Sequence, residues 1–229
     1  MSGLAALAIT RNHLTGTIPT ELFYMPRLRE LRLYANRLTG GIPVDIQNAT
    51  SLQALKVETN FLTGSLITEI GLVSSLTDLN IGFNDFSRKI PTELGKLKNL
   101  KSLRISSNSF SGRLPSEIGR MDSLEVLAMT ENLLFGSIPS YYGLLWNMKD
   151  FRVAGSGVGG FIPSEIALLT SMERLELGYN KFRGNLLTEI GKLTSLCKLH
   201  NDFASDNTAF DPPFLTFFLS LLFSLLGFE

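Results

Sequence analysis

Cysteine and histidine are scarce in this 229-residue sequence, which contains one cysteine, Cys197, and two histidines, His13 and His200. A lone cysteine excludes an intramolecular disulfide, and a long repeat protein can be stable without one. Nucleophilic catalysis needs a nucleophile, a base and a group that orients the base, and structural zinc needs four ligands. We therefore expect no enzyme activity, no metal and no cofactor.

An excess of charge of either sign is also missing. Lys and Arg together number 21, as do Asp and Glu, so the formal net charge is zero. A protein that binds nucleic acid usually carries a basic excess, so we expect no nucleic-acid partner. The first residues, MSGLAALAITRNH, have no basic segment ahead of a long apolar run, and we predict no signal peptide there.

The sequence instead contains a 24-residue repeat without insertions. Successive copies begin at Leu4, Leu28, Leu52, Leu76, Leu100, Leu124, Met148, Met172 and Leu196. A fixed period of this length is typical of a stacked array of coils rather than of a single globular core. Eight copies are complete, and the ninth loses the pattern after Leu199.

Each copy begins with strand-like alternation, in which positions 4 and 6 point to the same side, as Leu103 and Ile105 do in the fifth copy. Position 9 is asparagine in every complete copy except the seventh, which has Ser156. Short amides hydrogen-bond nearby backbone in turns, so we predict a ladder of stacked asparagines. Position 13 is glycine except at Arg88, which indicates a backbone angle that other residues resist.

The second half of the copy reads Ile-Pro or Leu-Pro in six of eight units, followed in most by Thr or Ser and then Glu, as in Thr92-Glu93. We predict that this Thr or Ser caps a short helix whose first turn carries the Glu. One copy cannot bury its apolar side alone, so stacking must build the core. The sequence thus predicts an α/β solenoid of about eight 24-residue repeats, roughly 40 Å long at the usual strand spacing.

The pattern Leu-x-x-Leu-x-Leu-x-x-Asn-x-Leu-x-Gly-x-Ile-Pro-x-x-Ile-Gly resembles the plant-type leucine-rich repeat, most closely over residues 76–147. The resemblance implies a right-handed superhelix with a parallel sheet on its concave side. It also implies similarity to receptor-kinase ectodomains and to inhibitors of cell-wall-degrading enzymes, which bind peptides or proteins. An extracellular or membrane-associated location would follow from the same resemblance.

Three regions are expected along the chain. Residues 1–199 form the solenoid, residues 200–213 form a linker or a degenerate ninth repeat, and residues 214–229 form an apolar tail. The tail is short for a membrane span. It can be a helix that caps the last coil, the product of a faulty gene model, a short or truncated membrane anchor, or a lipid-anchor signal. The first coil has no cap ahead of it, which favours a fragment or a partner at that end.

The outward side of the strands is the candidate binding surface. Position 5 is basic in four copies, and aromatic side chains lie on the same side, where there is no core to fill. Arginine and aromatic residues are enriched at binding hot spots. The predicted partner-binding residues are Arg32, Tyr34, Lys56, Glu58, Asn80, Phe83, Arg104, Arg152 and Tyr179.

We expect these residues to recognise a protein or peptide ligand, as in a receptor-like protein. Two alternatives remain. The face can be a solvated sheet balanced by Glu30, Glu58, Asp78, Asp150 and Glu173. The chain can also be a truncated or degenerate repeat protein with a structural role and no dedicated ligand. A glycosylation sequon, Asn48-Ala49-Thr50, occurs once, which is about what composition gives by chance.

Overall fold

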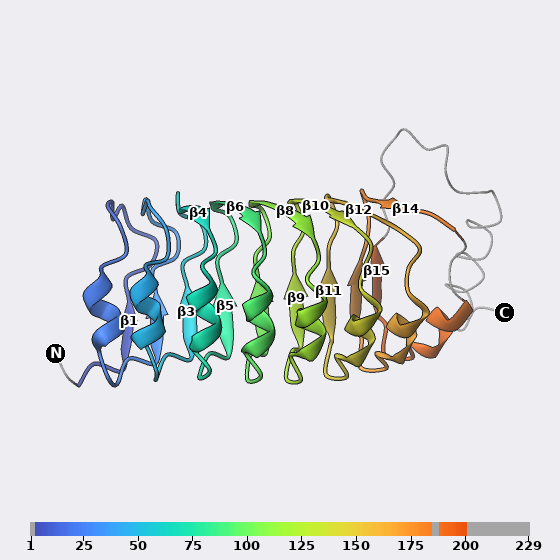
Figure 1. The fold of residues 1–229 in the computed structure, drawn as a ribbon, viewed down its shortest axis with the longest axis horizontal. Coiled ribbons are helices and arrows are strands. Elements are labelled where there is room, and N and C mark those ends of the chain that lie inside the picture. The colour runs from blue at the N-terminus through green and yellow to red at the C-terminus, as the bar shows by residue number, and fades with distance from the viewer. Residues whose placement is uncertain (1–2, 185–187, 201–229) are drawn as a thin grey trace.

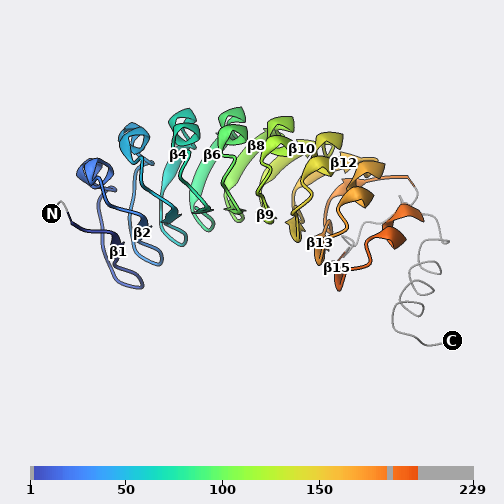
Figure 2. The same cartoon turned by 90° about the horizontal axis from the view of Figure 1, so that it is seen from below.

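Each 24-residue unit forms one coil, and the coils stack side by side along one curved axis (Figures 1 and 2). The computed structural model describes residues 3–184 and 188–200. The predicted apolar tail, residues 214–229, and nearly all of the predicted linker, residues 200–213, lie outside the described residues. In the part that is described, strands line the inner side of the arch and short helical turns line its outer side (Figure 2).

The inner, concave sheet is parallel, and each coil supplies one strand to it. Among the described residues its order is β1 (Ala6–Ala8), β2 (Glu30–Arg32), β3 (Ala54–Lys56), β5 (Asp78–Asn80), β7 (Ser102–Arg104), β9 (Val126–Ala128), β11 (Asp150–Arg152), β13 (Arg174–Glu176) and β15 (Lys198–His200). Paired residues are 24 apart, as in Leu55 with Leu79 and Leu79 with Leu103. The sequence period therefore sets the register of this sheet, as predicted.

A second parallel sheet, which the repeat pattern did not predict, runs along one flank of the arch. Its described strands, in order, are β14 (Lys181–Phe182), β12 (Gly157–Gly160), β10 (Leu133–Gly136), β8 (Ser109–Arg113), β6 (Asp85–Lys89) and β4 (Thr63–Ser65). Partners here are 22 residues apart, as in Gly64 with Phe86. Each strand is therefore displaced by two residues relative to the sequence period, which explains why a search at constant phase misses this pairing.

The return segment of each coil is a five-residue 3-10 helix on the convex side (Figure 2). The described helices are η1 (Thr20–Tyr24), η2 (Val44–Asn48), η3 (Thr68–Leu72), η4 (Thr92–Lys96), η5 (Ser116–Arg120), η6 (Ser140–Leu144), η7 (Ser164–Leu168) and η8 (Thr188–Lys192). The predicted Thr or Ser caps are wrong, because the residue before each of η1 to η7 is the N-cap and makes no side-chain capping bond.

The hydroxyl groups at the start of these turns contact a carboxylate instead. Thr68 Oγ1 donates to Glu69 Oε2 at 3.2 Å, and Ser116 Oγ donates to Glu117 Oε2 at 3.3 Å. The N-cap residue is proline in six of the seven turns η1 to η7, and it has an extended backbone, as at Pro91 with φ −68° and ψ 137°. Proline has no side-chain acceptor, so it cannot supply a capping hydrogen bond at these positions.

The core lies between the two sheets and the helical turns, and it is built from columns of identical repeat position. Leu79, Leu103 and Leu127 are fully buried in successive coils. Phe86 and Phe110 stack with ring centroids 6.2 Å apart. Because each coil covers the apolar side of the next, the stack as a whole removes surface that no single coil can bury. None of the helices described here has the length and hydropathy needed to cross a bilayer.

The predicted asparagine ladder is present. Asn60 Nδ2 donates to the carbonyl oxygens of Leu33 and Val57, both at 3.0 Å, and Asn60 Oδ1 accepts a bond from Leu38 N at 2.9 Å. Each buried amide thus joins its own coil to the preceding one. Ser156 breaks the ladder, because its hydroxyl oxygen is buried without a hydrogen-bond partner.

Arg88 occupies a backbone conformation that other coils give to glycine. Its φ is +69°, whereas Gly112 at the same repeat position has φ +91°. A left-handed conformation costs a non-glycine residue roughly 1–2 kcal/mol. Arg88→Gly should therefore raise the free energy of unfolding, by about 0.5–1 kcal/mol after the extra entropy of glycine in the unfolded chain is subtracted. Urea unfolding measures this change.

Gly64→Ala is the matched control for Arg88→Gly. Gly64 has φ +86° at the same repeat position, and a Cβ atom there would meet nothing within 4 Å. Backbone strain is then the main difference between alanine and glycine at this position. We expect Gly64→Ala to lower the free energy of unfolding by about 1 kcal/mol. If both variants shift stability in the same direction, backbone strain at this position is not the cause.

Candidate binding face

The concave sheet places the predicted basic column in register. Arg32 pairs with Lys56, Lys56 with Asn80, and Asn80 with Arg104, all on neighbouring parallel strands. Adjacent strands lie about 4.8 Å apart, so these four side chains share one continuous surface of roughly 15 Å. The structure therefore brings together the column that the sequence predicted for coils two to five.

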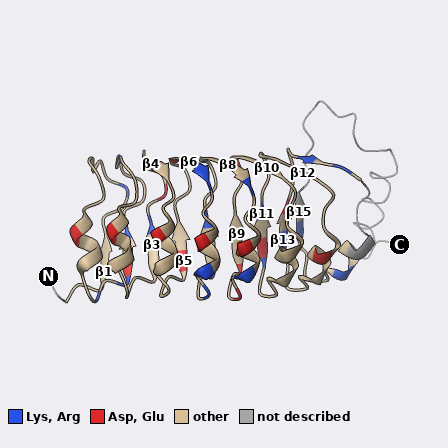
Figure 3. Cartoon of the chain, viewed as in Figure 1, with Lys and Arg blue, Asp and Glu red and all other residues tan. Residues whose placement is uncertain are grey.

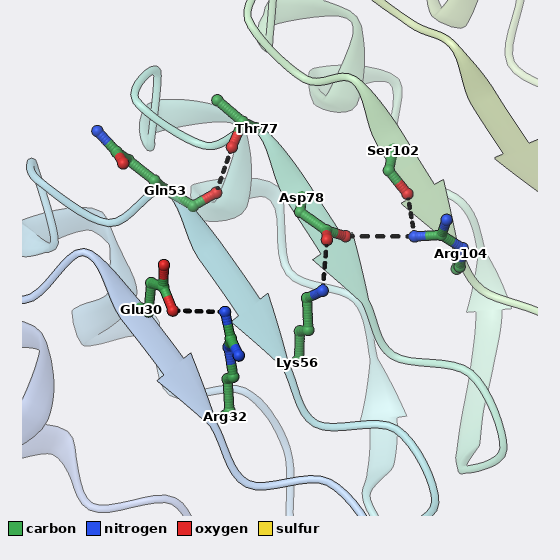
Figure 4. Close-up of polar contacts among 8 residues, drawn as sticks. All are labelled: Glu30, Arg32, Gln53, Lys56, Thr77, Asp78, Ser102 and Arg104. Atoms are coloured by element: carbon green, nitrogen blue, oxygen red, sulfur yellow. Dashed lines mark hydrogen bonds and ion pairs between the residues drawn. The ribbon is translucent and has the colours of Figure 1, made fainter. Parts of the chain in front are cut away.

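The cations of this column are paired with carboxylates from position 3 (Figure 4). Lys56 Nζ lies 2.7 Å from Asp78 Oδ2, and Arg104 Nη1 lies 3.5 Å from Asp78 Oδ1. Arg32 Nη2 lies 2.6 Å from Glu30 Oε2. These pairs are partly exposed to water, so each is worth about 1 kcal/mol or less. A ligand can therefore exchange them at small cost.

Ser102 completes this cluster and was not predicted, because serine at position 3 carries no charge signal. Arg104 Nη1 also donates to Ser102 Oγ, two residues earlier on the same strand (Figure 4). Asp78 and Ser102 therefore hold the guanidinium over the sheet from two strands. We call Lys56, Asp78, Ser102 and Arg104 the charged cluster.

Glu58 and Tyr34 lie at position 7, beyond the ends of β3 and β2, and both are half-buried. Removal from water raises the pKa of the Glu58 carboxyl, because desolvation disfavours its charged form. Its own backbone N–H, Lys56 and Arg104 offset part of this effect. Glu58 Oε2 is buried without a hydrogen-bond partner, so a donor from a ligand would satisfy an atom that the chain leaves unpaired.

Phe83 and Tyr179 are exposed aromatic residues at repeat position 8, just beyond the ends of the concave strands. Phe83 is 60% exposed and Tyr179 is 54% exposed, and both have a left-handed backbone, with φ +53° and +54°. Position 8 turns the chain away from the sheet in this conformation. Both side chains are therefore exposed where the chain leaves the concave sheet rather than packed in the core, and their part in binding stays a prediction.

The predicted residues do not form a single cluster. Arg152 pairs with Asp150 through Nε at 2.7 Å and belongs to coil seven, near Tyr179 of coil eight. Coil six lies between these two residues and the charged cluster. At repeat positions 3 and 5 it has Val126 and Ala128, which offer no polar side chain. The concave face thus has a charged cluster in coils three to five and a smaller polar group in coils seven and eight.

The convex side carries a different set of charges. Acidic residues occupy the second position of most helical turns and form an acidic column along the stack, seen in Figure 3 as a horizontal row of red segments on successive helices. The described members are Glu21, Asp45, Glu69, Glu93, Glu117 and Glu165. Among the residues that the structure describes, no group of three or more His, Cys, Asp or Glu side chains converges to hold a metal ion. The residues of this acidic column range from half-buried to exposed.

Exposed apolar side chains on the flank of coils six and seven were also missed. Leu133, Phe135 and Phe161 are more than half exposed, and the guanidinium of Arg183 lies 5.6 Å from the centre of the Phe161 ring. They occupy repeat positions 10, 12 and 14, which hold mostly polar or small residues in other coils. The departure from the repeat is the one signal in the sequence that could have pointed to them.

Comparison with known proteins supports the fold and the family. A model of a leucine-rich repeat region matches residues 89–225, and a leucine-rich repeat model matches residues 27–49 and 75–97. No match was found among curated proteins.

Solved plant receptor structures are similar to this chain. The ectodomain of the membrane receptor kinase GASSHO1/SCHENGEN3 from Arabidopsis thaliana, in complex with CASPARIAN STRIP INTEGRITY FACTOR 2, is 34% identical with a TM-score of 0.84. The plant peptide hormone receptor RGFR1 in complex with RGF2 is 31% identical with a TM-score of 0.76. The PEPR1–AtPEP1 complex is 33% identical with a TM-score of 0.72.

The alignments cover 87%, 88% and 86% of this chain and 24%, 36% and 31% of the three receptor chains. The chain therefore spans a quarter to about a third of the length of the receptors it matches. The repeat pattern, the two parallel sheets and these matches agree with one another. The chain belongs to the leucine-rich-repeat proteins, as a solenoid module similar to the ectodomains of plant peptide-hormone receptors.

Proposed function

We propose that this chain is a non-catalytic module that binds an extended peptide across the strands of its concave face, in a receptor-like protein. The observations that carry the proposal are the charged cluster and Phe83, which follows β5 in the coil that also contains Asp78. Partly exposed cations of the cluster are held by carboxylates of the same face, and an exposed aromatic ring stands where the chain leaves the concave sheet. The similar receptor structures that contain bound peptides lend it support.

The dimensions of the face fit a short peptide. Nine strands at about 4.8 Å spacing span roughly 38 Å, which an extended chain of about 12 residues would cover. Coils three to five account for about 10 Å of this length. A carboxylate of the peptide can replace Asp78 as partner of Lys56 or Arg104, and an apolar side chain can pack on Phe83.

The test begins with a random 12-residue peptide library displayed on phage and selected against the intact chain. Enriched peptides are synthesised, and their Kd values are measured by calorimetry for the wild-type chain and for variants. We expect Phe83→Ala to weaken binding about tenfold, which corresponds to about 1.4 kcal/mol. The triple replacement of Arg32, Lys56 and Arg104 by alanine should weaken it at least as much.

Matched controls lie on the convex side. Leu72 is a large apolar residue of η3 that is 56% exposed, and Arg120 is an exposed cation at the end of η5. Leu72→Ala and Arg120→Ala should leave the Kd within a factor of two, and circular dichroism should show that every variant is folded. Failure to enrich any peptide, or equal affinity of the concave variants and the wild type, would refute the proposal.

A further inference from the structure

Asn48 differs from the asparagines of the ladder in both sequence and position. It opens the sequence Asn48-Ala49-Thr50, and no other asparagine in the chain stands two residues before serine or threonine. Ladder asparagines at position 9 cannot do so, because the repeat places an apolar residue at position 11. Asn48 instead occupies position 21, as the last residue of η2 on the convex side.

The local structure exposes both residues that a glycosylation sequon needs. Asn48 and Thr50 are exposed, whereas Ala49 between them is buried and anchors the turn through Ala49 N to Ile46 O at 3.0 Å. Asn48 Nδ2 donates one bond, to Asp45 O at 3.1 Å. A side-chain amide has two N–H groups, and the bond to Asp45 O uses one of them, while the Tyr24 hydroxyl lies close enough to interact with the amide.

Exposed large side chains occupy neighbouring positions on the convex side around Asn48. Tyr24 and Leu72 occupy position 21 of the preceding and the following coil, and they are 62% and 56% exposed. Val44, at the start of η2, is 51% exposed. Tyr24 and Leu72 thus flank Asn48 at the same repeat position in the two neighbouring coils, and a hydrophilic group attached to Asn48 would lie between them and shield their apolar surface from other molecules.

We propose that Asn48 carries an N-linked oligosaccharide that covers the patch formed by Tyr24, Val44 and Leu72. This rests on the proposed function, because the modifying enzyme meets only chains that enter the secretory route. Asn48 Nδ2 forms a bond to the anomeric carbon of an oligosaccharide carried on a lipid diphosphate. The bond from that carbon to the diphosphate breaks, the lipid diphosphate leaves with the electron pair, and the amide loses one proton.

The test expresses the full chain in insect cells behind a heterologous secretion leader, with a C-terminal tag that contains a second sequon. The tag sequon reports that the chain has met the modifying enzyme. Peptide mass spectrometry should then find a glycan on Asn48 in most molecules, and release by an amidase should convert Asn48 to aspartate. Thr50→Ser should retain the glycan, whereas Asn48→Gln and Thr50→Ala should lose it. A glycosylated tag beside an unmodified Asn48 would overturn the proposal.

A second measurement tests shielding separately from modification. Secreted Asn48→Gln protein should bind a fluorescent apolar dye at least twofold more strongly than the glycosylated wild type, and Asn48→Gln combined with Leu72→Ser should reverse most of that increase. Equal dye binding by the wild type and Asn48→Gln would refute the covering role. Both readouts are independent of peptide binding, so a failure of the Asn48 proposal and a failure of the proposed function give different experimental results.

Discussion

Asn84→Ala is expected to lower the free energy of unfolding by about 3 kcal/mol. Asn84 Nδ2 donates to the carbonyl oxygens of Val57, Ile81 and Gly82 at 3.0–3.1 Å, and its Oδ1 accepts from Leu62 N at 3.0 Å. Alanine removes all four bonds and leaves the buried Leu62 N–H without its side-chain partner. An unsatisfied buried group costs about 1–3 kcal/mol, and the carbonyl oxygens add to this. Urea unfolding followed by circular dichroism measures the loss.

Asn12→Ala serves as the matched control. Asn12 occupies the same repeat position in the first coil but is exposed, and its side chain donates to Thr10 O at 2.9 Å. Water can replace that bond, so we expect a change below about 0.5 kcal/mol. Comparable losses for Asn12→Ala and Asn84→Ala would show that the ladder contributes little and that asparagine acts through its local turn.

Gly95→Ala is expected to cost about 2–3 kcal/mol. The Cβ atom of an alanine there would lie 2.4 Å from the carbonyl oxygen of Glu117 in the next coil. Gly71, Gly119 and Gly143 make the same close approach, at 2.4–2.6 Å. Because the obstructing atom belongs to the backbone, a coil must move to make room, and overpacking of this kind costs about 1–3 kcal/mol. Thermal unfolding should show the loss, and hydrogen exchange should rise in η4 and η5.

Gly191→Ala tests whether stacking is the cause. Gly191 has the same repeat position, in η8, but nothing described lies within 4 Å of a Cβ added there. We expect no loss of stability, since alanine favours helical turns over glycine. Alanine occupies this repeat position naturally in coil seven, as the buried Ala167, so the stack accommodates a methyl group at that coil. A loss at Gly191 equal to that at Gly95 would assign the effect to the turn itself.

Features that follow the 24-residue phase could be predicted from the sequence. Leu103 and Leu127 are buried side by side because identical positions stack, and Asn60 and Asn84 form the ladder for the same reason. The alignment of Arg32 with Lys56 on one face also follows from the period. In each case one residue type repeats at one position, so a single coil predicts its neighbours.

Features that depend on side-chain conformation or on a different register could not be predicted. Glu30 pairs with Arg32 on its own strand, whereas Asp78 pairs with Lys56 and Arg104 on neighbouring strands, although Glu30 and Asp78 share position 3. The side-chain rotamers of Glu30 and Asp78 decide which cation each carboxylate contacts. The second parallel sheet, along the flank of the arch, could not be predicted from the 24-residue period because its strands pair with an offset of 22 residues.

Photo-crosslinking tests the central claim, recognition of a peptide by the concave strands, most directly. A benzophenone-bearing residue replaces either Asn80, at the end of β5 on the concave face, or Leu72, on the convex side. Each chain is irradiated with a peptide enriched from the displayed library. We predict covalent capture of the peptide from position 80 and little from position 72. Capture from position 72 alone, or equal capture from both positions, would contradict the account.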